Sequence, residues 1–256
     1  MKKKMKIGMG QMLVQPGKPE SNLERAGNMI RDAVRNKCDV IVLPECMDLG
    51  WTYPGAGKVA EPIPGHYSDI LCEAAKKFDI HVVAGLTERC DELLYNTAVM
   101  ISSKGDILTS HRKVNELDFA KNLYTTGNQL ATVDTSFGRV GIPVCADLLP
   151  EGNPLGHSFG LMEARLLLSP SAWAVRPEHD HAVTPYGEEW QKSYTELAAK
   201  HEMTVIGVSN VGRMEGGEWD GWKCIGCSLA VGPDGAVLAQ GSYGEEKEEL
   251  IVFDLP

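Results

Sequence analysis

Apolar residues recur along this chain with two different spacings. From residue 21 to residue 34 they recur three or four positions apart, which predicts a helix with one buried face, and residues 21–24 have the form of a capping box at its start. Residues 68–78 and 188–200 also predict helices, and residues 157–163 predict a short one. Such one-sided helices need a sheet or another helix to cover them.

Short apolar runs rich in β-branched residues lie between the helical segments and predict strands. The early strands alternate with helices as βαβ units do, and the turn at residues 102–105 predicts a hairpin. The pattern indicates an α/β protein, but it leaves open one sheet covered on both faces or two sheets packed together. The predicted strands are residues 6–12, 40–43, 80–86, 96–101, 107–108, 130–134, 137–145, 164–168, 204–208, 228–231, 237–239 and 250–253.

Length and charge limit what the chain can be. It has 256 residues and no linker, repeat or low-complexity tract, so we expect a single domain over residues 1–256. The formal net charge of −10 argues against nucleic acid or an anionic membrane surface as partner.

Targeting signals and cysteine usage point to one compartment. The basic start lacks the apolar stretch of a signal peptide, and no segment approaches the roughly 18 uninterrupted apolar residues of a membrane helix. The seven cysteines are scattered and odd in number, which indicates reduced thiols and not a secreted disulfide framework. We therefore expect a soluble cytoplasmic protein.

The run from residue 137 to Cys145 would deliver a thiol to the carboxyl end of a strand, where ligands bind in α/β sheets. Cys145 is the candidate nucleophile, although a buried structural cysteine is the alternative for any such residue. Pro143 cannot donate to a strand ladder, so its position predicts a local irregularity just before the cysteine.

Two further segments place chemical groups at strand ends. Glu45 follows the run at residues 39–43, and Lys113 follows the predicted hairpin. A carboxylate base, an ammonium and Cys145 would make a Glu-Lys-Cys site. Cys46 adjoins Glu45, but neighbours in an extended strand point to opposite faces, so we expect it in the core.

These three segments resemble the catalytic motifs of the nitrilase, or carbon-nitrogen hydrolase, superfamily. The matching stretches are Leu43-Pro44-Glu45, His111-Arg112-Lys113 and GIPVCADLLPE around Cys145, and the resemblance runs from about residue 5 to residue 255. It implies a four-layer α-β-β-α sandwich, a homodimer or higher homo-oligomer, and no cofactor or metal.

The chemistry of these residue types fits hydrolysis of non-peptide carbon-nitrogen bonds. Glu45 would take the thiol proton of Cys145, and Lys113 with the Ala146 backbone N–H would stabilise the oxyanion on the way to a thioester. We expect an amidase or N-carbamoyl amidohydrolase acting on a small linear substrate. The alternatives are a nitrilase acting on a nitrile and a catalytically weak nitrilase-like binding protein.

One position departs from the family pattern. Members of this superfamily often have a second glutamate shortly before a segment that corresponds here to residues 124–127, but this chain has Ala120 or Asn122 at that spacing. Glu116 is the nearest carboxylate able to support Lys113. Its alternative is an ordinary solvated side chain.

Substrate recognition is expected from the loop after the strand that follows Cys145. Trp173, Arg176 and His179 lie there, and a guanidinium at Arg176 could hold a carboxylate in a bidentate pair. Residues 212–222 are a possible second wall. A metal at residues 179–181 is disfavoured because the flanking residues are typical of a loop. A metal at the CxxC pair Cys224 and Cys227 is disfavoured because further ligands are missing.

Overall fold

The structure is a computed structural model that describes residues 5–149 and 153–255. The first residues of the basic start lie outside the described residues, as do Pro150 and Glu151 at the end of the Cys145 motif. None of the helices in these two ranges combines the length and apolar composition that a membrane span requires.

The first sheet has six strands and brings the beginning and the end of the chain together. β1, β2 and β3 pair in parallel, while β4 and β5 continue the sheet in antiparallel pairing. The last strand, β15, pairs antiparallel with β1 at the other edge. In sheet order the strands are β15 (Glu249–Asp254), β1 (Lys6–Gln11), β2 (Val40–Val42), β3 (His81–Cys90), β4 (Leu93–Ile101) and β5 (Ile107–Arg112).

A second six-stranded sheet contains the strand that precedes Cys145. Its centre, β10, β8 and β7, is parallel, and antiparallel strands flank it on both sides. The order is β14 (Val237–Gln240), β13 (Leu229–Val231), β10 (Thr204–Ser209), β8 (Leu166–Ser171), β7 (Gly138–Gly141) and β6 (Thr132–Thr135). A small third sheet holds β11 (Val211–Arg213), β12 (Lys223–Ile225) and β9 (Ala174–Val175).

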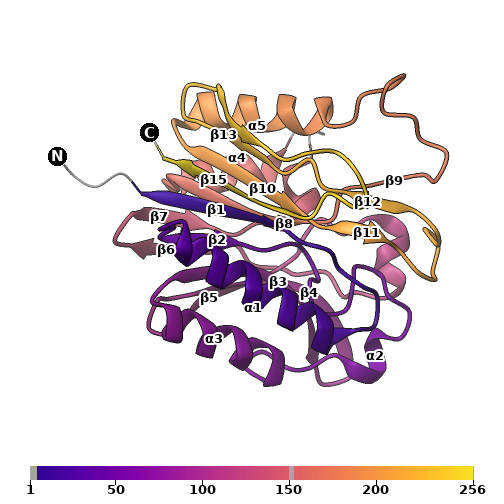
Figure 1. Cartoon of the computed structure of the whole chain (residues 1–256). Helices are drawn as coiled ribbons and strands as arrows, with labels where there is room; N and C mark the ends of the chain where they lie inside the picture. Colours follow the sequence, from indigo (N-terminus) through magenta and orange to yellow (C-terminus); the bar gives the residue numbers. More distant parts are fainter. Residues whose placement is uncertain (1–4, 150–152, 256) are drawn as a thin grey trace.

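Helices cover the outer faces of the two large sheets, which makes the four layers visible in Figure 1. α1 (Pro19–Arg35) and α3 (His66–Phe78) lie on the first sheet, and α4 (Pro154–Leu161) and α5 (Glu188–His201) lie on the second. The predicted α-β-β-α sandwich is confirmed. Of the two arrangements that the pattern had left open, the structure has two packed sheets and not one sheet covered on both faces. The remaining helices are α2 (Ala56–Val59) and the 3-10 helices η1 (Asp118–Asn122) and η2 (Cys145–Leu148).

Strand periodicity accounts for the two large cores. Val40 and Val42 of β2 belong to the core between the sheets, whereas Ile41 and Leu43 belong to the core under α1 and α3. Successive side chains of a strand point to opposite faces, so an uninterrupted apolar run suits a strand that is covered on both sides.

Several predicted boundaries were wrong, among them the end of β3, the end of β5 and both ends of α4, and two further misses bear on the rules used to place them. α1 begins at Pro19, so Ser21 lies inside the helix and does not cap it. Proline has a fixed φ and no N–H to lose, which suits the first turn of a helix. The strand expected to reach Cys145 ends at Gly141, because Pro143 cannot continue the ladder, and the irregularity predicted from Pro143 is present.

The short elements around the site had no sequence signal. β9, β11 and β12 have two or three residues each, and α2 has four. Elements this short contain one pattern repeat or little more, which is too few positions for periodicity to identify them, so tertiary contacts determine them.

Candidate active site

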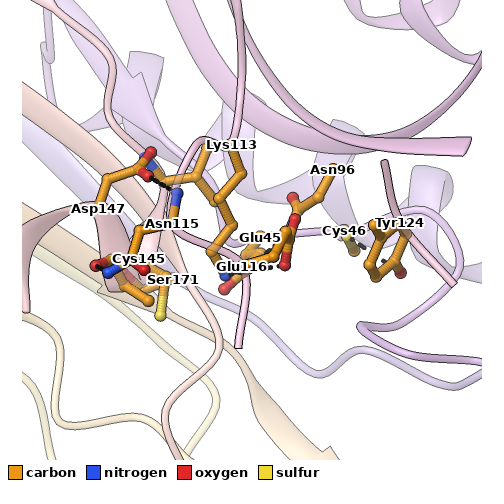
Figure 2. Close-up of polar contacts among 12 residues, drawn as sticks. Glu45, Cys46, Asn96, Lys113, Asn115, Glu116, Tyr124, Cys145, Asp147 and Ser171 are labelled. Atoms are coloured by element: carbon orange, nitrogen blue, oxygen red, sulfur yellow. Dashed lines mark hydrogen bonds and ion pairs between the residues drawn. The ribbon is translucent and has the colours of Figure 1, made fainter. Parts of the chain in front are cut away.

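Glu45, Lys113 and Cys145 come together at one edge of the two facing sheets. Glu45 lies in the loop after β2, Lys113 directly follows β5, and Cys145 opens η2 after β7. The first sheet therefore supplies the carboxylate and the ammonium, and the second sheet supplies the thiol. Figure 2 shows the three side chains with their polar neighbours.

Glu45 is fixed through one carboxylate oxygen. Its Oε1 accepts hydrogen bonds from Asn96 Nδ2 at 2.6 Å and Lys113 Nζ at 2.7 Å. Its Oε2 is buried without a hydrogen-bond partner. The Glu45 backbone N–H donates to the Ser171 carbonyl of β8 at 3.2 Å, which ties this loop to the second sheet. The held carboxylate keeps one oxygen free for a proton.

Lys113 is 1% exposed and lies between two carboxylates. Its Nζ is 2.7 Å from Glu45 Oε1, 3.7 Å from Glu116 Oε2 and 5.3 Å from the ring centroid of Trp51. Burial alone would lower the pKa of the ammonium, but Glu45 and Glu116 outweigh burial and hold the pKa well above its usual value. Lys113 is therefore a fixed positive charge and not a base.

Glu116 is buried beside Lys113, although a solvated loop carboxylate had been the alternative. It is 3% exposed, and neither carboxylate oxygen has a hydrogen-bond partner. Burial, opposed by Lys113, raises the pKa of Glu116 to about 7. Glu116 also borders a cavity of about 580 Å³, together with residues that include Leu117, Leu149 and Glu189.

Cys145 is 8% exposed and adopts a left-handed backbone conformation, with φ of +42°. Such a conformation is rare outside glycine and occurs disproportionately at functional sites. Burial and the neighbouring carboxylate of Glu45 raise the pKa of the Cys145 thiol, while Lys113 opposes them. The thiol is therefore protonated near neutral pH, and attack on a carbonyl requires a base beside it.

Two glycines let backbone segments approach the candidate catalytic residues closely. A Cβ on Gly85 would lie 2.6 Å from Glu45 Cα, and one on Gly127 would lie 2.0 Å from the Arg112 carbonyl oxygen. The Gly127 N–H donates to the Lys113 carbonyl at 2.8 Å. Any larger residue at these two positions would displace Glu45 or Lys113.

Sequence reasoning missed two polar residues that hold the site. Asn96 lies within β4 and donates to Glu45, yet nothing in its local sequence distinguishes it from other strand residues. Asp147 lies two positions after Cys145 and bonds to the segment around Lys113. For Asp147 a carboxylate inside an otherwise apolar run was the available signal, whereas Asn96 had none.

The predicted oxyanion donor is close to these contacts. Ala146 follows Cys145 in η2 and is 2% exposed, and its carbonyl accepts a hydrogen bond from Asn115 Nδ2 at 2.6 Å. The first N–H groups of a helix have no partner within it, so the Ala146 N–H is available by position. Its role stays a prediction.

The residues predicted to recognise substrate lie in very different surroundings. Trp173 is 2% exposed and stacks on Trp190, with ring centroids 4.9 Å apart, so it is part of the core. Arg176 is exposed, and its guanidinium lies 5.6 Å from the ring centroid of Trp222. His179 is half-buried, with Nε2 lacking a hydrogen-bond partner. These roles stay predictions.

The possible metal ligands do not cluster. All seven cysteines are free, Cys224 and Cys227 among them, and the His181 ring stacks on Tyr243 at 3.8 Å. Within residues 5–149 and 153–255, no three His, Cys, Asp or Glu side chains are grouped so that they could hold a metal ion. That the reaction needs no cofactor stays a prediction.

Comparison with known proteins agrees with this geometry. Residues 6–256 match the family model described as carbon-nitrogen hydrolase. A nitrilase of Pyrococcus abyssi is 26% identical over 98% of this chain and 90% of its own length. An omega-amidase of Xenopus laevis is 25% identical over 94% of this chain and 86% of its own.

A solved structure shares the fold. An amidase from Nesterenkonia sp. AN1 superposes with a TM-score of 0.83 at 20% identity, over 98% of this chain and 90% of the amidase. In that structure the acetamide moiety of fluoroacetamide is attached covalently to the active-site cysteine of the amidase.

Proposed function

The chain belongs to the carbon-nitrogen hydrolase family, and from this premise we propose that it is an amidase that hydrolyses a small linear amide through a thioester on Cys145. The observation that carries the proposal is the hydrogen bonding of the Glu45 carboxylate. One oxygen is held by Asn96 and Lys113, and the other is free beside a thiol that needs a base.

In the first half of the reaction, Glu45 takes the thiol proton and Cys145 Sγ attacks the amide carbonyl carbon. Lys113 and the Ala146 N–H stabilise the negative charge that develops on the carbonyl oxygen. The carbon-nitrogen bond then breaks as Glu45 returns the proton to the leaving nitrogen. Ammonia or an amine leaves, and the acyl group remains on Cys145 as a thioester.

In the second half, water attacks the thioester carbonyl while Glu45 takes a proton from it. The carbon-sulfur bond breaks, the carboxylic acid is released, and the proton returns to Cys145. Glu116 supports this cycle as a second carboxylate beside the Lys113 ammonium, with its Oε2 3.7 Å from Nζ. The chain's own residues supply every proton transfer, and one water molecule is consumed.

The comparisons support an amide as the substrate class. The Xenopus laevis relative is an omega-amidase, and the Nesterenkonia protein is an amidase with an acetamide group on its cysteine. An N-carbamoyl amino acid would use the same residues and would place its carboxylate toward Arg176. The Pyrococcus abyssi relative is a nitrilase, so a nitrile is the second candidate substrate.

Ammonia release tests the proposal on three substrate sets: short linear amides, N-carbamoyl amino acids and nitriles. We expect turnover of amides by the wild type and none by Cys145→Ala or Cys145→Ser, with the fold retained. The matched control is Cys72→Ala, because this half-buried cysteine lies on α3, outside the site. It should keep full activity.

Mass spectrometry of the acylated protein identifies the nucleophile independently. An acyl adduct on the peptide that contains Cys145 is the expected result. An adduct on Cys46 or Cys224, or turnover by Cys145→Ala within about tenfold of wild type, a barrier change of only about 1.4 kcal/mol, would rule out the covalent mechanism. Turnover of nitriles without turnover of amides would favour the second candidate.

A further inference from the structure

Asp147 is a buried carboxylate surrounded by hydrogen-bond donors. Its Oδ1 accepts from the backbone N–H groups of Val114 at 3.1 Å and Asn115 at 2.7 Å. Its Oδ2 accepts from the Val144 N–H at 2.9 Å and lies 2.8 Å from His111 Nε2. All four partners are donors when Nε2 of the imidazole carries the proton.

The donors to Asp147 come from the two segments that carry Lys113 and Cys145. His111 and Val114 lie on either side of Lys113 in the sequence, and Val144 directly precedes Cys145. One carboxylate therefore joins the segment that presents the ammonium to the turn that presents the thiol. These two segments follow β5 and β7, which belong to different sheets, and Asn115 Nδ2 adds a bond to the Ala146 carbonyl at 2.6 Å.

We propose that Asp147 is a positioning residue, which holds Lys113 and Cys145 at the separation that the reaction needs. The proposal rests on the proposed function of these two residues. Catalysis is sensitive to such placement, because a displacement of about 1 Å can cost about a hundredfold in rate. A carboxylate is suited to the task because its two oxygens accept several bonds in fixed directions.

The electrostatics of Asp147 agree with this role. Burial would raise the pKa of its carboxyl group, but His111 and the surrounding backbone N–H groups outweigh burial and lower the pKa. The side chain therefore stays ionised with all four donors around it. Nδ1 of His111 is buried without a partner, so the proton of a neutral imidazole is best placed on Nε2, facing Asp147.

Asp147→Asn separates the positioning role from simple side-chain packing. The amide has nearly the same shape, but one oxygen becomes an NH₂ group that cannot accept. Turned toward Val114 and Asn115, this group would meet two backbone donors. Turned the other way, it would meet a His111 nitrogen that can switch to accepting, and the Val144 N–H would lose its partner. In that orientation the hydrogen bond that is lost is the one that holds Val144, the residue before Cys145.

Steady-state kinetics on the best amide substrate are the main test. For Asp147→Asn we expect kcat to fall by about a hundredfold while KM changes by less than about threefold. The rate at which iodoacetamide alkylates Cys145 should fall as well, and this readout needs no turnover. A lower melting temperature with unchanged kcat and unchanged alkylation would assign Asp147 to structure alone and overturn the proposal.

Asp48→Asn is the matched control. Asp48 is also fully buried and also accepts backbone N–H groups, from Leu49 and Thr87, but it does not join Lys113 to Cys145. Its kcat should stay within about threefold of wild type. An equal loss of kcat in both variants would show that any buried carboxylate matters equally, which contradicts the proposal.

His111→Phe covers the case in which Asp147→Asn fails to fold. The phenyl ring can keep the edge contact with Phe159, where the ring centroids are 6.0 Å apart, but it removes one donor from Asp147. We expect kcat to fall by roughly tenfold at nearly constant KM, as for loss of one charge-assisted bond. An unchanged kcat would contradict the proposal.

The outcome for Cys145 separates the two levels of inference. If Cys145→Ala is inactive while Asp147→Asn and His111→Phe are fully active, the positioning role is wrong and the proposed function stands. If Cys145→Ala is active, the proposed function is wrong, and the alkylation rates alone then report whether Asp147 places the thiol.

Discussion

Lys113 in the candidate active site is 1% exposed and lies beside both Glu45 and Glu116, whereas Arg176 in the loop after β9 is exposed and rests against the ring of Trp222. The first cation is held by buried partners on two sides. The second can move in solvent. The groups proposed to perform the chemistry are thus held by buried partners, and the groups proposed to select the substrate can adapt to it.

The difference in burial between Lys113 and Arg176 changes the strength of their charge interactions. Charge interactions are strong where water is excluded and weak where water screens them, so equal substitutions should have unequal effects in the two regions. The four predictions below test that expectation, beginning with the largest effect.

Glu45→Gln should cause the largest loss, a fall in kcat of about a thousandfold, because an amide cannot take the thiol proton. The glutamine can still accept from Asn96 and Lys113, so the fold should be kept. Stopped-flow measurement of Cys145 acylation locates the lost step. The control is Glu178→Gln in the exposed loop, which should stay within about twofold; a large effect there would break the comparison.

The buried centre should also impose a pH dependence on stability through Glu116. Its pKa is about 7 in the folded protein and near 4.5 in the unfolded chain. Between these two pH values Glu116 holds a proton in the folded state but not in the unfolded chain. The contribution of Glu116 to the free energy of unfolding is therefore highest below pH 4.5 and is lost as the pH rises through 7. Glu116→Gln should therefore gain up to roughly 3 kcal/mol relative to wild type over that window.

Urea unfolding of both proteins at pH 5 and pH 8 measures this difference. Asp48, whose pKa is also raised by burial to about 7, is present in both proteins and cancels. Arg176→Lys serves as the exposed comparison and should show no pH-dependent change in stability. A constant difference between Glu116→Gln and wild type would mean that Glu116 is solvated.

Glu116→Gln should lower kcat by about tenfold, the cost of losing one charge beside the Lys113 ammonium. KM should change less, because Glu116 acts through Lys113. The measurement is steady-state kinetics at pH 8, where the wild-type carboxylate is ionised. Full activity would return attention to Asn122, the other position considered for a supporting residue.

Arg176→Lys should have the smallest effect, about two- to fivefold in kcat/KM, since exposed ion pairs contribute little. The loss should appear with an N-carbamoyl amino acid and not with its neutral amide analogue. The experiment is therefore paired on these two substrates. Equal losses on both would remove the carboxylate role of Arg176, and a loss above about a hundredfold would show that the loop closes over the substrate.

Much of the site could be read from the chain because local and tertiary preferences agree there. The runs before Glu45 and Lys113 contain strands in the structure: Glu45 lies three residues after the end of β2, and Lys113 directly follows β5. Pro143 correctly indicated an irregular approach to Cys145. For β2 and for the approach to Cys145 one local rule, that proline ends a strand, was sufficient, whereas β5 continues through the polar residues 109–112 to the position before Lys113.

Other features depend on contacts between distant segments. Glu116 resembles any loop glutamate, yet the fold buries it, and Asp147 acquires its role from Val114 and Asn115, which follow β5 of the other sheet. The start of α1 was misplaced for a different reason. Residues 21–24 fit a capping box, but Pro19 offered an earlier start, and a local pattern cannot rank the two.

The pairing of β15 with β1 has a consequence for how the protein is made. The outer edge of β1 stays without a neighbour until residues 249–254 have left the ribosome, so the sheet that carries Glu45 and Lys113 is completed last. During synthesis that open edge can pair with strands of other chains, which is a route to aggregation. A chain shortened before β15 should therefore be found in inclusion bodies, even though every proposed catalytic residue is present in it.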